Sequence, residues 1–149
     1  MRVFDYVHRS QHALRGQPNV LALGCFREGT LYEVSLQQVG GPSVDFTGVL
    51  YSRQQAAAGF VSSAVDPESA DEPTDAMGDP TLYKVGSTIA GTSGVGSFTS
   101  ATGVPYCNAD GGVTRAKNRI YLVLTPASGG GDQDTAWDVR VRGTSIPNV

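Results

Sequence analysis

The stretch TAWDVRVR at residues 135–142 alternates apolar and polar side chains without a break. In an extended chain its bulky apolar residues fall on one side and its charged residues on the other: Trp137, Val139 and Val141 inward, Asp138, Arg140 and Arg142 outward. A repeat of two residues is typical of a strand with one buried and one exposed face. We therefore expect residues 135–142 to form a β-strand whose inner face packs on a hydrophobic core.

Other stretches carry strand signals of the same kind. Residues 30–39 alternate, and their buried face is expected to hold three large apolar side chains: Tyr32, Val34 and Leu36. Residues 119–125 (RIYLVLT) are almost wholly apolar, which is typical of a strand buried on both faces. Residues 28–29 (EG) predict a tight turn before the alternating strand. Further strands are expected at residues 19–27, 44–52, 81–90 and 104–107, while residues 91–103 form either a loop or a weak edge strand.

This pattern predicts the fold class. About seven to nine short strands with at most one helix indicate an all-β protein, built as an antiparallel β-sandwich, a jelly roll or a small barrel. Strands do not alternate with helices, so a parallel sheet is not expected. The chain has 149 residues, and we place a single β domain at residues 16–149. Nineteen glycines and two lysines suit many short strands joined by tight turns.

Two segments differ from the expected strands. Residues 1–15 are interpreted as an N-terminal arm or a short helix, because Phe4, Val7 and Leu14 can share a helical face. Residues 66–80 carry six acids, three prolines and no basic residue. This composition predicts a long, exposed acidic loop.

Charge and hydropathy limit the classes of partner. The net charge is −3, whereas a protein that binds nucleic acid is usually strongly basic, so nucleic acid is not expected as a partner. We also expect no membrane association, because the apolar runs are far shorter than the ~20 residues of a spanning helix. The first residues do not resemble a secretion signal, so we expect the chain to be made in a cytoplasm. Whether Cys25 and Cys107 pair is left open.

Few residues carry recognisable chemistry. On a helix His8 and His12 would share a face, but they lack the glutamate of the H-E-x-x-H zinc motif. The glycines of residues 91–96 lack the G-K-[ST] ending of a phosphate-binding loop. Calcium at the turns with Asn108 and Asp110, or with Asp132 and Asp134, is disfavoured because neither has EF-hand spacing. We expect no enzyme activity, no cofactor and no metal.

In its general character the chain resembles a virion structural protein of a tailed bacteriophage, of the head decoration or cement type. The resemblance lies in the Gly/Ser/Thr-rich residues 91–103, in the closing strand at residues 135–142 and in the short tail after it. It implies a β-rich dimer or trimer located on the capsid surface of the virion. The implied partner is the major capsid protein, whose subunits the protein would clamp together.

The candidate contact residues combine apolar anchors near the N-terminus with arginines: Val3, Phe4, Tyr6, Arg9, Arg140 and Arg142. The arginines of the closing strand either contact carboxylates of a neighbouring chain or are solvated charges on a sheet face.

Two other functions remain open. One is a different virion part, such as a tail tube, a head–tail connector or a fibre module. The other is a carbohydrate-binding β-sandwich that uses Trp137, Tyr51 or Tyr106.

Overall fold

The computed structural model describes residues 2–13, 16, 18–23, 27–52, 83–108, 120–128 and 135–146. All regular secondary structure in this part of the chain is β, which confirms the predicted all-β class. The eight strands are β1 (Arg2–Ala13), β2 (Asn19–Leu23), β3 (Glu28–Val39), β4 (Phe46–Ser52), β5 (Tyr83–Gly91), β6 (Val95–Cys107), β7 (Ile120–Pro126) and β8 (Thr135–Ile146). Within these described ranges there is no helix long and apolar enough to cross a membrane.

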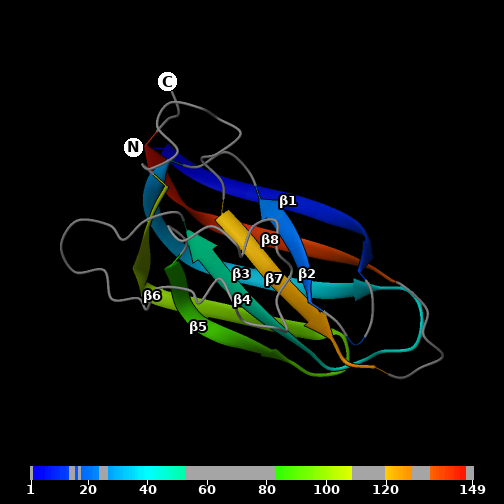
Figure 1. Cartoon of the computed structure of the whole chain (residues 1–149). Helices are drawn as coiled ribbons and strands as arrows, with labels where there is room; N and C mark the ends of the chain where they lie inside the picture. Colours follow the sequence, from blue (N-terminus) through cyan, green and yellow to red (C-terminus); the bar gives the residue numbers. More distant parts are fainter. Residues whose placement is uncertain are drawn as a thin grey trace.

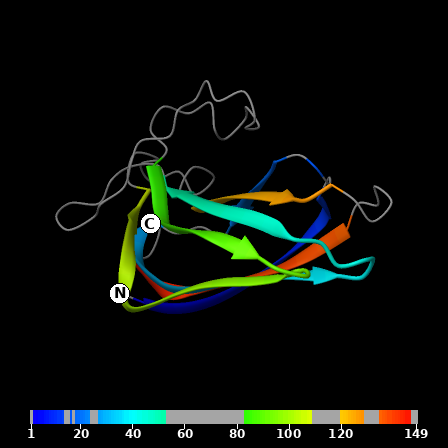
Figure 2. The same ribbon diagram turned by 90° about the horizontal axis from the view of Figure 1, so that it is seen from below.

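The strands form two antiparallel sheets of four strands each (Figure 1). Sheet A has the order β1-β8-β3-β6 and sheet B the order β2-β7-β4-β5. The two sheets lie over one another as the layers of a sandwich, with β4 and β7 in one layer and β1 and β8 in the other (Figure 2). The pairs β1–β8, β2–β7, β3–β6 and β4–β5 are nested, as if one long hairpin had been rolled up. This is the strand order of a jelly roll, one of the three predicted architectures.

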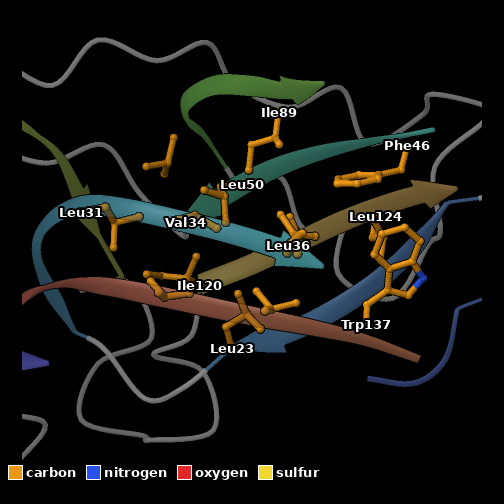
Figure 3. Packing of buried hydrophobic residues seen from close by; sticks show 14 of the residues in the cluster. Leu23, Leu31, Val34, Leu36, Phe46, Leu50, Ile89, Ile120, Leu124 and Trp137 are labelled. Atoms are coloured by element: carbon orange, nitrogen blue, oxygen red, sulfur yellow. The ribbon is translucent and has the colours of Figure 1, made fainter. Parts of the chain in front are cut away.

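The hydrophobic core lies between the two sheets (Figure 3). The inward side chains of β8, which are Trp137, Val139 and Val141, are fully buried, as their alternation predicts. The ring of Trp137 meets the ring of Phe46 from the facing sheet edge to face, with 4.7 Å between the ring centres. Aromatic pairs prefer such an arrangement, which joins the two layers at one end of the core.

Strand β3 corrects two predictions. Residues 28–29 begin this strand and do not form a turn. The register of β3 against both of its neighbours shifts between Leu31 and Glu33, which marks a β-bulge. Because a bulge adds one residue to a strand, it changes which side chains face the core. Leu31 is therefore buried, and Tyr32, which was expected inside, is 41% exposed.

The N-terminal segment is neither an arm nor a short helix, so that prediction is wrong. Residues 2–13 form β1, which pairs with β8 from Arg2 to Ala13. The side chains of β1 alternate between the two sides of the sheet, which a helical interpretation overlooks. Phe4 and Tyr6 lie against the core, and Val3 and Val7 lie on the exposed side. Pairing with β8 gives the segment backbone hydrogen bonds that a free arm would have to make with water.

The glycine-rich stretch also belongs to the sheets. Residues 91–103, interpreted as a loop or weak edge strand, continue β5 to Gly91 and then enter β6, which joins them to the expected strand at 104–107. Between the two strands Ser93 and Gly94 adopt positive φ angles of 51° and 79°. Their tight turn lets the chain pass from sheet B to sheet A within three residues.

The predicted acidic loop at 66–80 lies outside the described residues, as do Cys25, Asp110, Asp132 and Asp134.

A matched pair of substitutions tests the inner face of sheet A. Val139 of β8 is fully buried, while Val95 of β6 is 58% exposed. Val139→Ala should lower the free energy of unfolding by about 2 kcal/mol, because it removes two buried methyl groups and leaves a cavity. Val95→Ala should change it by less than about 0.5 kcal/mol. Urea denaturation followed by tryptophan fluorescence measures both, and equal losses would contradict the assignment of the two faces.

Candidate functional site

The side of sheet A that faces away from the core is the candidate site, and we call it the outer face of sheet A. The strand register defines its residues. They are Val3, Asp5, Val7 and Arg9 of β1, Asp138, Arg140 and Arg142 of β8, Glu33, Ser35 and Gln37 of β3, and Val95, Ser97 and Thr99 of β6. Most side chains toward β6 are short and polar, whereas charges gather over β1, β8 and the nearer side of β3.

Arg9 and Asp138 stand opposite each other in the β1–β8 pair and form a bidentate ion pair. Arg9 donates from Nε to Oδ1 over 2.7 Å and from Nη2 to Oδ2 over 2.9 Å. The planar guanidinium matches the carboxylate with two parallel hydrogen bonds, so the contact fixes the orientation of both groups.

Asp5 is the centre of a second cluster that spans three strands. Arg140 of β8 donates to both of its carboxylate oxygens, over 2.8 Å from Nε and 2.5 Å from Nη2. Arg142 lies 3.5 Å from the same carboxylate and 3.4 Å from Oε2 of Glu33 on β3. The cluster therefore links β1, β8 and β3 across the surface.

These contacts shift the acidities of their members. The Arg140 hydrogen bonds lower the pKa of Asp5 from 3.8 to about 2, and Arg142 adds to the effect. The contact with Arg9 likewise lowers the pKa of Asp138. In turn the pKa values of Arg9 and Arg140 are raised by their carboxylates. All four groups are therefore charged at neutral pH.

The arrangement suits recognition more than chemistry. Three arginines and three carboxylates of the outer face of sheet A balance one another, and their side chains are 32–62% exposed. Exposed ion pairs contribute only about 0–1 kcal/mol to folding, so their main effect is a fixed pattern of charge. A surface with alternating charges at set positions can select a partner that carries the complementary pattern.

The predicted contact residues divide between the two sides of sheet A. Val3, Arg9, Arg140 and Arg142 lie on its outer face, and Val3 is 86% exposed. Phe4 and Tyr6 point the other way and pack, half-buried, against the core: their alternation with Val3 and Asp5 already places them there. Sequence reasoning missed Asp5 and Glu33, which are the partners of the β8 arginines within the chain.

The remaining chemical candidates do not assemble into a site among the described residues. His8 lies on a strand, where residues four apart are about 13 Å apart, so the helical spacing with His12 does not arise. The ring of His8 stacks on Tyr6 at 6.3 Å. Cys107 is buried, with Sγ 3.7 Å from Oε2 of Glu28. No group of three or more metal-binding side chains occurs in the described ranges.

Two of the three aromatic residues considered for sugar binding lie in the core between the sheets, and the third has little exposed surface. Trp137 and Tyr106 are fully buried, and Tyr51 is 7% exposed. The hydroxyl of Tyr106 donates to the carbonyl oxygen of Thr144 over 3.1 Å, and burial raises its pKa. Trp137 and Tyr106 belong to the core between the sheets and cannot stack on a sugar ring without unfolding part of the sandwich. Tyr51, next to the core residue Leu50, lies on the opposite side of sheet B.

Comparisons of the chain with protein-family models, with curated proteins and with solved structures find no match. The candidate site therefore rests on the geometry of the outer face of sheet A.

The Asp5 cluster makes stability depend on acid. Because the folded pKa of Asp5 is about 2 and its ordinary value is 3.8, its contribution is complete above pH ~4 and is lost as the pH falls towards 2. Between pH 4 and 2 the denaturation midpoint of Asp5→Asn should fall less steeply than that of the unmodified protein. Arg140→Met should return the Asp5 pKa towards 3.8, as measured by carboxyl NMR titration. Parallel midpoint curves, or an unchanged Asp5 pKa, would contradict the cluster.

Proposed function

We propose that this chain is a non-enzymatic virion structural protein that binds and stabilises the capsid shell of a tailed bacteriophage, as a decoration or cement protein. The observation that supports the proposal most directly is the outer face of sheet A, a broad surface with its charges already fixed in place. The jelly-roll strand order is compatible with it, since capsid proteins use this architecture; lectins and cupins use it too, so the fold alone is an analogy.

The face has the properties that a clamp needs. Its arginines and carboxylates hold one another in place, so little side-chain entropy is lost when a partner covers them. Its serine and threonine side chains are short and lose little freedom on contact. Val3 and Val7 add exposed apolar area, at 86% and 62% exposure. The proposed partner is the major capsid protein, on the outside of the shell, and the proposed contacts are Val3, Arg9, Arg140 and Arg142.

One observation favours a second candidate, a carbohydrate-binding module. The bulge in β3 leaves Tyr32 41% exposed, and an exposed tyrosine can stack on a sugar ring. Binding to a glycan array that is abolished by Tyr32→Ala would favour this function.

A third possible function is that of a tail tube, connector or fibre module. Such a protein would form a ring or fibre of many copies, which a mass measurement of the purified protein would detect.

Two substitutions of one residue type test which sheet meets the capsid. Thr99 of β6 is exposed on the outer face of sheet A, and Thr47 of β4 is exposed on the opposite side of the molecule, on sheet B. We expect the purified protein to cosediment with empty shells of the major capsid protein from the same viral genome. Thr99→Arg should weaken this binding by roughly tenfold, because a long side chain at the contact keeps the two surfaces apart. Thr47→Arg should leave it unchanged.

The control also separates two kinds of failure. Weaker binding for Thr47→Arg alone would place the contact on sheet B and overturn the assignment of the face. No cosedimentation of the unmodified protein at all would overturn the capsid function itself.

A further inference from the structure

Strand β1 is the end strand of sheet A, and no described strand pairs with its second edge. It is twelve residues long, and its sequence RVFDYVHRSQHA contains no proline, glycine or lysine. Exposed edges in natural sheets are usually short or interrupted by lysine, proline or a bulge, since an open edge invites another strand. Here the one irregularity of the β1–β8 pair lies near the end of the strand, between Ser10 and Ala13.

The other end strands are less suited to pairing. β2 has five residues. β5 bends at Gly86, where φ is 72°, and β6 contains Gly103 with φ 83° and then Pro105. Since each of these features interrupts a regular ladder, β1 offers the longest regular edge in the part of the chain that the structure describes.

Residues 5–9 (DYVHR) are complementary to themselves when two copies run antiparallel. With Val7 opposite Val7 of a second copy, Asp5 stands opposite Arg9 of that copy, and Arg9 opposite its Asp5. Opposite charges and β-branched residues are favoured cross-strand neighbours. We propose that β1 pairs with β1 of a second copy in this register, about a two-fold axis at Val7, so that the two A sheets join into one sheet of eight strands.

Other registers lack this match. An axis at Asp5 would bring the two Asp5 carboxylates directly opposite each other, and like charges in that position destabilise a pair. An axis at Tyr6 would set Asp5 against Val7 and Arg9 against Val3, so that neither charged side chain would face an opposite charge on the second copy. The side chains thus select the register, and the backbone hydrogen bonds of the added strand supply affinity.

The proposed register continues the ion pairs that already exist within one chain. Arg9 contacts Asp138, and Asp5 contacts Arg140. Across the new strand pair the charged side chains would form a continuous row. It would run from Asp138 to Arg9 of one copy and on to Asp5 and Arg140 of the second copy, with negative and positive charges alternating. A carboxylate has acceptor sites for more than one arginine, so the pairs within each chain need not be broken.

This inference does not rest on the proposed capsid function, because the pairing needs no other protein. The two are tested separately: sedimentation equilibrium of the purified chain gives its mass without any shell present. We expect a dimer that dissociates reversibly on dilution. A mass of one chain over the whole range up to about 100 μM would overturn the proposal, because a pair with a dissociation constant in the micromolar range is associated at that concentration.

Matched lysine substitutions test the edge. Val7 and Val95 are both exposed valines on the outer face of sheet A, but they lie on its two opposite end strands. Val7→Lys should raise the dimer dissociation constant by roughly tenfold or more, since it puts two positive charges opposite each other at the axis. Val95→Lys should leave the constant unchanged. An unchanged constant for Val7→Lys, or a loss of the dimer with Val95→Lys alone, would overturn the proposal.

Cysteine crosslinking tests the register, and it stays informative if Val7→Lys fails to fold. Under mild oxidation Val7→Cys should form a disulfide-linked dimer, because the two residues would face each other at the axis. Val3→Cys should not, since Val3 would stand opposite Gln11. The unmodified chain controls for Cys25 and Cys107. A crosslink through Val3→Cys in place of Val7→Cys would overturn the register.

Discussion

The position of β8 in the middle of sheet A is the constraint on which the rest of the structure depends. This strand pairs with β1 on one side and with β3 on the other, so it joins the C-terminal part of the described chain to two strands of its N-terminal part. Its approach to β3 is close enough that a Cβ on Gly29 would overlap the carbonyl oxygen of Thr144, and one on Gly143 would overlap that of Thr30. Any larger residue at these two glycines would force the central strands apart.

The same strand links the core to the surface. Because side chains of a strand alternate, the residues that bring Trp137 and Val139 into the core also bring Asp138 and Arg140 to the outside. The backbone positions of the charged residues on the outer face of sheet A are therefore set by the same strands that form the core. A surface built in this way differs from one carried on loops, because the spacing of its backbone positions cannot change without repacking the sandwich.

The sequence predicts the parts of the fold that depend on local alternation. The strand at residues 135–142 and the inward direction of Trp137 follow from period-two alternation, and the strand at residues 119–125 follows from its apolar, β-rich composition. The bulge at Tyr32 could not be foreseen, because it arises from pairing with two strands distant in sequence. The ion pairs were missed for the same reason: Asp5 and Arg140 are 135 positions apart, and only the register of β1 against β8 brings them together. The alternation of Val3, Asp5, Val7 and Arg9 was visible in the sequence, but a helical interpretation of residues 1–15 concealed it.

The nested pairing of first with last strands has a consequence for the order in which the protein is made. While residues 135–146 are still within the ribosome, β1 and β3 have no strand between them, and sheet A cannot close. The strands of sheet B, which pair through β4, β5 and β7, are complete earlier in synthesis. Until residues 135–146 have been made, the growing chain therefore lacks the strand that pairs with both β1 and β3, and the edges of these two strands are open to other chains or to chaperones.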